Sequence, residues 1–324
     1  MNEMRARLGA GIRSLRTVVP WVLAAAAVPS VVRLVGDHGA PWAVMLTVLV
    51  PLLIPVLVVL TLLAALLGNR GTALCGGVVL LVNALWLAPL WISNPPPRSG
   101  QKIVAMTLNM RYGLAAPSKI IDRVRADRVD LLALEELTPE AVSRLAAGGL
   151  NAMLPYQVLS PGDRAHGSGL WSRWPLSRGP DWDGVHHMPG ATVRVAGQDV
   201  VVRVMHPFRT GRSSAAAYRR DYRQVTARAH ALDPATPSIM LGDFNAGRDQ
   251  QAFRALLGNR WRDAPEYAGS GFTPTWNWWT FLPPVLPLDH ILISRQLGAT
   301  RTATFRAPGS DHHGLVAWLV LQPR

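Results

Sequence analysis

The sequence predicts an α/β fold of two packed sheets flanked by helices, preceded by an N-terminal region of about three transmembrane helices. Charged residues are scarce in the first hundred positions: none occurs between Asp37 and Arg70 or between Arg70 and Arg98. The second half instead alternates short apolar runs with helical stretches, which is typical of sheets covered by helices. We therefore expect a membrane region over residues 1–98 and a separate folded domain over residues 99–324.

The strongest candidate span covers residues 42–67, which carry no charge. A bilayer core requires about 20 apolar residues, so this segment is long enough to cross it. Pro51 and Pro55 are expected to kink the helix. Residues 72–91 form a second candidate, which ends at Trp91 shortly before a run of prolines.

The most N-terminal candidate, residues 17–32, is shorter, with 16 uncharged residues between Arg16 and Arg33. A cleaved signal peptide is the alternative interpretation. Because two further apolar runs follow, an uncleaved span is preferred.

Basic residues predict the orientation of these spans. Four arginines precede the first span, at positions 5, 7, 13 and 16, and Arg70 lies between the second and third. The positive-inside rule places both groups in the cytoplasm. We therefore expect a multi-pass cell-membrane protein whose C-terminal domain is extracytoplasmic. If the first segment does not cross, the two basic groups cannot both be cytoplasmic. The oligomeric state stays open.

The composition is strongly basic, with a formal net charge of +13. A basic catalytic face favours anionic substrates such as nucleic acid or lipid phosphate. The alternative is a general preference for arginine, since Lys102 and Lys119 are the only lysines. The single cysteine, Cys75, excludes an intrachain disulfide and a cysteine-based zinc site.

The second half shows the elements of the predicted sheets. Two helices are expected, over residues 118–127, with Ser118 as N-cap, and over residues 214–231. Strands are expected over residues 103–109, 130–134, 169–172, 191–195, 200–205, 238–241, 291–294 and 315–321.

Side chains that bind metals and phosphates lie at the ends of six of these strands. They are Asn109, Glu136, His206, Asp243 with Asn245, Asp289 with His290, and Asp311 with His312. Any one of them alone is an ordinary turn or structural residue. Together they predict one site, because carboxylate oxygens bind Mg²⁺ and imidazole handles a proton beside it. Such a site suits phosphate-ester hydrolysis.

These motifs, in this order, resemble the endonuclease/exonuclease/phosphatase superfamily, the deoxyribonuclease I-like fold. The most specific matches are Gly-Asp-Phe-Asn at residues 242–245 and Ser-Asp-His at residues 310–312, and the resemblance covers residues 103–321. It implies a four-layer α/β sandwich and a divalent cation, usually Mg²⁺, with Mn²⁺ as the alternative.

The resemblance also implies roles for individual residues. Glu136 corresponds to the principal metal ligand, with Asn109 beside it and Asp311 assisting. His290 is expected to pack or to support the site from behind rather than to bind metal.

The expected catalytic residues are assigned in the same way. Asp243 positions or deprotonates the attacking water, and Asn245 hydrogen-bonds the scissile phosphate or its metal. His312 acts as acid and base, oriented by Asp289, while His206 contacts a phosphate oxygen.

Two positions depart from the family pattern. Glu135 stands where the family usually has Gln, so the extra carboxylate either raises metal affinity or points into solvent. His313-Gly314 replaces a bulky residue followed by Pro, which leaves the substrate contacts of that loop open.

The substrate is less determined than the chemistry. A phosphodiesterase acting on nucleic acid or phospholipid headgroups is preferred; the alternatives are a phosphomonoesterase of the inositol-phosphate type and a catalytically silent, membrane-tethered binding module. The aromatic loop Trp276–Phe281 stacks on bases, contacts lipid headgroups or simply packs.

Overall fold

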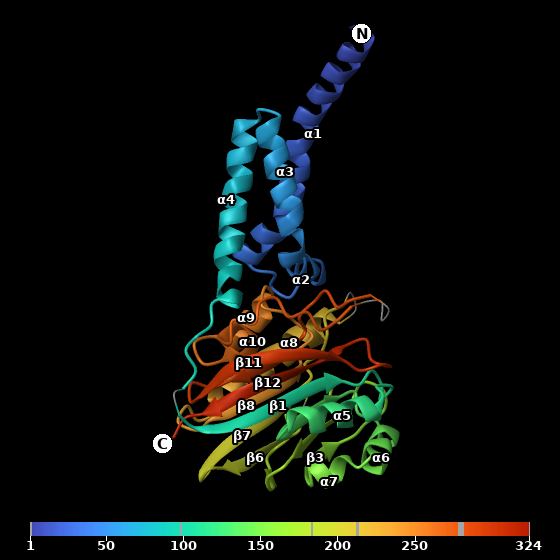
Figure 1. The fold of residues 1–324 in the computed structure, drawn as a ribbon, viewed down its shortest axis with the longest axis vertical. Helices are drawn as coiled ribbons and strands as arrows, with labels where there is room; N and C mark the ends of the chain where they lie inside the picture. The colour runs from blue at the N-terminus through green and yellow to red at the C-terminus, as the bar shows by residue number, and fades with distance from the viewer. Residues whose placement is uncertain (1, 98, 183, 212–213, 278–281, 324) are drawn as a thin grey trace. The chain divides into compact units, whose positions relative to one another are not determined.

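A computed structural model describes residues 2–97, 99–182, 184–211, 214–277 and 282–323 (Figure 1). The chain separates into two compact units. The helical unit comprises residues 1–88 with 249–251, and the sandwich comprises residues 89–248 and 252–324.

The described part of the helical unit contains α1 (Asn2–Val35), α2 (Pro41–Val48), the short 3₁₀ turn η1 (Pro51–Leu53), α3 (Ile54–Leu66) and α4 (Arg70–Leu87). A second 3₁₀ turn, η2 (Ala88–Trp91), begins at residue 88 of this unit and continues into the sandwich. Two stretches, Ala10–Val35 and Arg70–Trp91, are long and apolar enough to cross a membrane. The pair Pro41–Val48 and Pro51–Leu66 is bent by 48° and makes a third if it acts as one broken span. The break falls at Pro51, where a kink was expected.

Polar contacts and a small residue hold this unit together. Asn83 Nδ2 on α4 donates to Ser30 Oγ on α1 at 2.9 Å, and both residues are buried. A Cβ at Gly76 would lie 2.2 Å from Thr61 Oγ1, so the glycine permits close approach of α4 and α3.

The sandwich contains two six-stranded sheets. The first, in the order β11-β12-β1-β2-β4-β3, comprises β1 (Gln101–Asn109), β2 (Leu131–Glu135), β3 (Tyr156–Ser160), β4 (Ser168–Ser172), β11 (Leu297–Arg306) and β12 (His313–Leu321). The second, in the order β5-β6-β7-β8-β10-β9, comprises β5 (Leu176–Arg178), β6 (Gly190–Val195), β7 (Gln198–Met205), β8 (Ser238–Asp243), β9 (Arg262–Asp263) and β10 (Asp289–Ile293).

Side-chain alternation along the strands separates two cores. Ile103 and Ala105 of β1 pack between the sheets, whereas Val104 and Met106 face the covering helices. The first sheet is covered by α5 (Pro117–Asp127), α6 (Pro139–Ala147) and α7 (Leu150–Met153). The remaining helices of the sandwich are α8 (Ala215–Ala231), α9 (Gln251–Leu257) and α10 (Ala264–Tyr267). The predicted α/β sandwich is confirmed.

Several local expectations were wrong. Helix α5 begins at Pro117 after the N-cap Ala116, so Ser118 is inside the helix rather than its cap. Strands β3, β5, β9 and β11 were not expected. β11 is an edge strand rich in Thr and Arg, with an exposed second half, so it lacks the apolar run that identifies central strands.

Candidate active site

The ends of six strands meet at one edge of the sandwich. Strands β1 and β2 are parallel and end at Asn109 and Glu135, while the antiparallel β12 begins beside them. In the second sheet, β7 and β8 are also parallel, and Asp289 at the start of β10 pairs with Asp243 at the end of β8. In both sheets, the strand ends that carry these polar residues therefore lie at the same edge.

The alternation that builds the core between the sheets also aims the polar residues inward. Every second residue of a strand faces the same side of its sheet. Asn109 therefore faces the same side of β1 as the core residue Ile103, and Glu135 the same side of β2 as Leu131. In the second sheet, His206, Asp243 and Asp289 likewise lie on the side of the core residues of their strands. These polar side chains thus replace the apolar core where the strands end.

Glu136 reaches the site by a different route. Counted along an extended β2 it would face the helices, but its φ is +53°, a left-handed conformation. The turn brings its carboxylate to the site, where Oε1 accepts from Asn109 Nδ2 at 3.2 Å and Oε2 from the Tyr112 amide at 2.8 Å.

Asn109 joins the two sheets. Its Nδ2 donates to Asp243 Oδ2 at 2.9 Å as well as to Glu136. Its Oδ1 accepts from the Arg111 amide at 2.8 Å. In this arrangement Asn109 orients two carboxylates. To bind a metal there, its side-chain amide would have to turn so that Oδ1 faces the carboxylates. Its predicted role as a metal ligand stays a prediction.

His312 lies between two carboxylates. Its Nδ1 is 2.8 Å from Asp289 Oδ2, and its Nε2 is 3.6 Å from Asp243 Oδ2. The backbone is fixed by Ser310, whose hydroxyl accepts from the His312 amide and donates to Asn109 O. The predicted carboxylate–imidazole pair is therefore present in the structure.

The electrostatics of this group follow from burial and neighbouring charge. Burial raises the pKa of Asp243 to about 7 even though His312 opposes the rise. Burial alone would lower the pKa of His312, but Asp289 and Asp243 together raise it to about 10. His312 is consequently an imidazolium at neutral pH, able to donate a proton from the Nε2 side.

His206 is buried beside Asp243, with Nε2 at 3.8 Å from Asp243 Oδ2. The ring of His186 stacks on it at a centroid distance of 4.0 Å. Burial holds the pKa of His206 well below its ordinary value, so this imidazole is neutral. It suits hydrogen bonding better than charge neutralisation.

Asn245 and Asp311 lie at the rim of this group. The Asn245 amide donates to Asp243 Oδ1 at 2.8 Å, and its Nδ2 donates to Pro207 O at 3.1 Å. Asp311 Oδ2 accepts from Trp276 Nε1 at 3.3 Å. Both residues thus border the cluster, and their predicted roles stay predictions.

Glu135 does not point into solvent, so that interpretation was wrong. It is fully buried, and both its carboxylate oxygens lie within 3.1 Å of Thr107 Oγ1. Burial, and next the charge of Asp289, raise its pKa well above the ordinary value. The residue is therefore a neutral acid beneath the cluster.

The other positions that the sequence left open have structural roles. His290 binds Asp263 Oδ2 through Nδ1 at 2.8 Å, which agrees with its expected packing role. The ring of Phe305 packs on Gly314, because a Cβ there would lie 2.1 Å from Phe305 Cε1. Of the loop Trp276–Phe281, residues 278–281 lie outside the described residues.

A divalent cation fits this edge. Within the described ranges, Asp243, Asp289 and His312 offer ligand atoms that all lie within 4.8 Å of one another, and the two carboxylates can bind a cation while His312 stays protonated. Asp289 Oδ1 is buried without a hydrogen-bond partner in the described part of the chain, as an ion ligand would be. This group differs from the ligands predicted from sequence, Glu136, Asn109 and Asp311, whose assignment stays a prediction.

Some contributors were not predicted. Thr275 Oγ1 accepts from the amides of Leu288 and Asp289 and so fixes the start of β10. Thr107 and Ser310 act similarly beneath and beside the cluster. Thr107 and Thr275 belong to no motif, although Thr107 lies at the inward-facing position two residues before Asn109; Ser310 belongs to the Ser-Asp-His motif, but its role was not predicted.

Residues 106–312 match the sequence profile of the Endonuclease/Exonuclease/phosphatase family. The chain belongs to this family. Its members are hydrolases that act on phosphate esters and depend on divalent metals, so phosphoesterase activity is supported for this chain. No curated protein matches the sequence.

Solved structures share the fold at low identity. An endonuclease/exonuclease/phosphatase from Beutenbergia cavernae DSM 12333 has a TM-score of 0.53 at 19% identity, covering 68% of this chain and 72% of its own. D. rerio TDP2 complexed with single-strand DNA product has a TM-score of 0.54 at 16% identity, with coverage of 68% and 99%. The mannosyl-6-phosphatase Bt3783 of Bacteroides thetaiotaomicron VPI-5482 has a TM-score of 0.51 at 17% identity, with coverage of 68% and 100%.

Proposed function

We propose that this chain is a membrane-anchored, divalent-metal-dependent phosphodiesterase that cleaves its substrate by in-line attack of water. The observation that carries the proposal is the hydrogen-bonded series Glu136–Asn109–Asp243, which continues through His312 to Asp289. It combines hard oxygen ligands, a carboxylate suited to align water and an imidazolium within one buried group.

Each residue has a distinct task. Glu136, assisted by Asn109 and Asp311, holds Mg²⁺, or alternatively Mn²⁺, and the ion when bound neutralises charge on the phosphate oxygens. Asp243 receives the proton of the attacking water, which its pKa of about 7 suits.

The remaining side chains act at the phosphate. His312 donates its Nε2 proton toward the phosphate or the leaving oxygen, and Asp289 keeps the ring oriented through Nδ1. His206 and Asn245 hydrogen-bond phosphate oxygens, for which the neutral state of His206 is appropriate.

The substrate class is an anionic phosphodiester, either nucleic acid or a phospholipid headgroup. A net charge of +13 favours such substrates. The neighbours of this fold include one named with a DNA product and one named as a sugar-phosphate phosphatase, so a phosphomonoester of the inositol-phosphate type is the second candidate.

The helical unit is proposed to cross the membrane three times, with residues 1–98 as the anchor and residues 99–324 as the catalytic domain. Arg16 Nε donates to Leu67 O at 2.5 Å, and Asn69 Nδ2 donates to Arg16 O at 2.9 Å. Arg16 and the turn before Arg70 therefore share one end of the unit, as cytoplasmic placement of both requires. The catalytic domain is then extracytoplasmic.

An activity comparison tests the chemistry. Full-length protein in detergent is assayed against plasmid DNA, sphingomyelin-type lipid and inositol phosphates, with and without EDTA. Asp243→Asn should lower hydrolysis by roughly 10²–10⁴-fold with the fold intact, since it replaces a buried carboxylate whose ionisation burial already opposes. Asp199→Asn, an exposed residue of β7 in the same sheet, is the matched control.

The outcomes separate the candidates. Cleavage of inositol phosphates alone identifies a phosphomonoesterase, and binding without turnover of any substrate identifies a silent module. Near wild-type turnover by Asp243→Asn would overturn the assigned role. For the topology, a reporter fused after Arg324 that is active only in the cytoplasm refutes the extracytoplasmic placement.

A further inference from the structure

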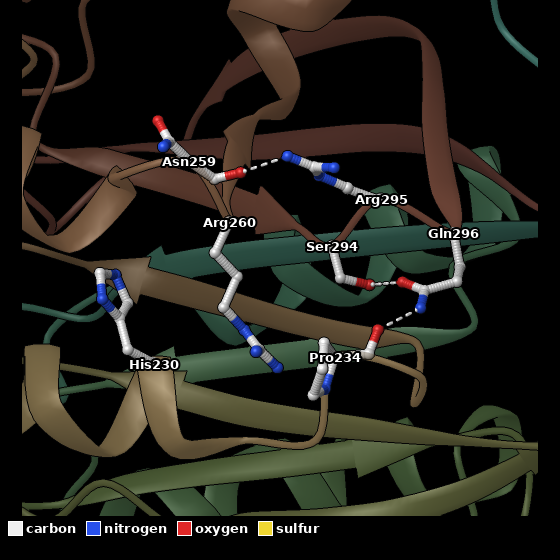
Figure 2. Close-up of a pocket in the computed structure, with 7 residues that line it drawn as sticks. All are labelled: His230, Pro234, Asn259, Arg260, Ser294, Arg295 and Gln296. Carbon is white, nitrogen blue, oxygen red and sulfur yellow. Dashed lines mark hydrogen bonds between the residues drawn. The ribbon is translucent and has the colours of Figure 1, made fainter.

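A second polar cavity lies at the other end of the strands that carry the candidate site. It has a volume of about 520 Å³ and is lined by His230, Pro234, Arg260, Ser294, Arg295 and Gln296, among others (Figure 2). Ser294 follows β10 directly, whereas Asp289 begins it, so roughly 15 Å of strand separates the two places. The cavity is therefore distinct from the catalytic edge.

The charged side chains that line the cavity are all positive. Arg260 and Arg295 line it, and no acidic side chain does so among the described residues. The charge of Arg260 acts on Asp233, but the pKa of Asp233 is lowered mainly by its hydrogen bonds to the Ala235 amide and the Thr236 hydroxyl. Each carboxylate oxygen of Asp233 thus already accepts a bond within its own turn, and neither bonds to a guanidinium.

Arg260 lies with its guanidinium 5.7 Å from the centroid of the Trp261 ring, but two of its nitrogens lack hydrogen-bond partners among the described residues. Its Nε and Nη2 are buried and have no hydrogen-bond partner within the part of the chain that the structure describes. Figure 2 shows its guanidinium between His230 and Pro234. A buried guanidinium with unpaired donors is costly unless an acceptor meets it, and its planar fork matches an oxyanion in two-point contact.

The walls around Arg260 are fixed in advance. Gln296 Nε2 donates to Pro234 O at 2.6 Å, and Ser294 Oγ donates to Gln296 Oε1 at 2.8 Å. Arg295 Nη2 donates to Asn259 O at 3.2 Å (Figure 2). These bonds tie the loop before β8 to the loop after β10, so the cavity keeps its shape without a ligand.

We propose that this cavity binds a phosphate-type oxyanion, held by the guanidinium fork of Arg260 with Arg295 as the second cation. The volume lies within the range of about 300–1,000 Å³ typical of small-molecule sites, so it accepts a phosphate carried on a larger group. The phosphate belongs either to a soluble molecule or to a lipid headgroup. The site is independent of the hydrolytic reaction, and its failure leaves the proposed function untouched.

Binding of pyrophosphate tests the proposal. Full-length protein in phosphatidylcholine nanodiscs, in buffer freed of divalent ions on a chelating resin, is titrated with pyrophosphate by calorimetry. Arg260→Gln should weaken binding at least about tenfold, which corresponds to about 1.4 kcal/mol. Arg194→Gln, an exposed arginine of β6 in the same sheet, removes the same charge and should bind like wild type.

Three results would overturn the proposal: wild-type affinity in Arg260→Gln, equal weakening in Arg194→Gln, or no saturable binding. If Arg260→Gln fails to fold, Arg260→Lys replaces it; this variant keeps the charge without the fork and should also bind more weakly, and unchanged affinity would contradict the contact. Repeating the titration in nanodiscs that contain phosphatidic acid distinguishes a lipid-headgroup phosphate from a soluble one. Competition with pyrophosphate supports a headgroup ligand, and unchanged affinity supports a soluble phosphate in the same cavity.

Discussion

In the helical unit, large apolar side chains such as Leu62 and Leu81 face outward, whereas in the sandwich they fill the space between the sheets. The exposed large apolar residues in the described part of the sandwich are few: Trp91, Ile92, Tyr112, Leu114, Tyr156 and Leu282. An outward apolar surface of this extent is stable only against lipid or another apolar surface, so the difference agrees with the membrane anchor that we propose.

The polar interiors of the two units also differ. In the helical unit Ser30 and Asn83 form a neutral buried pair whose side chains hydrogen-bond each other, and Asp37 and Asp249 are also buried. The sandwich buries three ionisable side chains together, Asp243, Asp289 and His312. A neutral pair joins helices, whereas a charged group at a strand edge is expected where chemistry takes place.

The largest effect is expected from removing the imidazolium. Because Asp289 and Asp243 raise the pKa of His312 to about 10 against the effect of burial, its contribution to stability is fully present below about pH 6.5 and is lost as the pH rises through about 10. His312→Asn should lower hydrolysis by roughly 10²–10⁴-fold and remove on the order of a few kcal/mol of stability at pH 6.

The loss of stability is measured by chemical unfolding of full-length protein between pH 6 and 10 in metal-free buffer, followed by tryptophan fluorescence. The wild-type free energy of unfolding should decline more steeply over this range than that of His312→Asn. Parallel profiles would show that His312 is neutral in the folded protein. His187→Asn, a change at a more exposed histidine, is the matched control.

The next effect concerns the outward apolar surface. Leu81 on α4 and Leu114 in the sandwich are each 60% exposed. Leu81→Arg should cost about 2.5–3.5 kcal/mol of insertion free energy if α4 lies in lipid, whereas Leu114→Arg should be tolerated because water surrounds it. The measurement is the fraction of each variant that resists carbonate extraction from membranes. Equal extraction of both variants would contradict a lipid-facing α4.

Much of this organisation is visible in the sequence because it follows from periodicity. Strands with two buried faces, such as β1 and β8, appear as apolar runs, and counting in twos places Asn109 and Asp243 on one face. The edge strand β11 was missed because pairing with β12, rather than its own apolar pattern, defines it.

The fine geometry of the site was less predictable. The left-handed turn at Glu136 depends on the Tyr112 amide, and the burial of Glu135 depends on how the second sheet closes over it. Both are consequences of packing between distant segments, which local pattern does not encode. The roles of individual residues came from resemblance to the family rather than from periodicity.

The smallest expected effect isolates the neutral acid beneath the cluster. Burial and Asp289 raise the pKa of Glu135 in the folded protein, whereas Glu135 of the unfolded chain ionises above about pH 4.5. Wild-type stability should therefore fall as the pH rises from about 4.5 toward the raised pKa of the folded protein. Glu135→Gln keeps the shape and the acceptor for Thr107 without titrating. In metal-free buffer it should be more stable than wild type at pH 8, by about 1.4 kcal/mol for each pKa unit of the rise, and no more stable at pH 4. A variant that is less stable than wild type at pH 8 would contradict a protonated Glu135 in the folded protein.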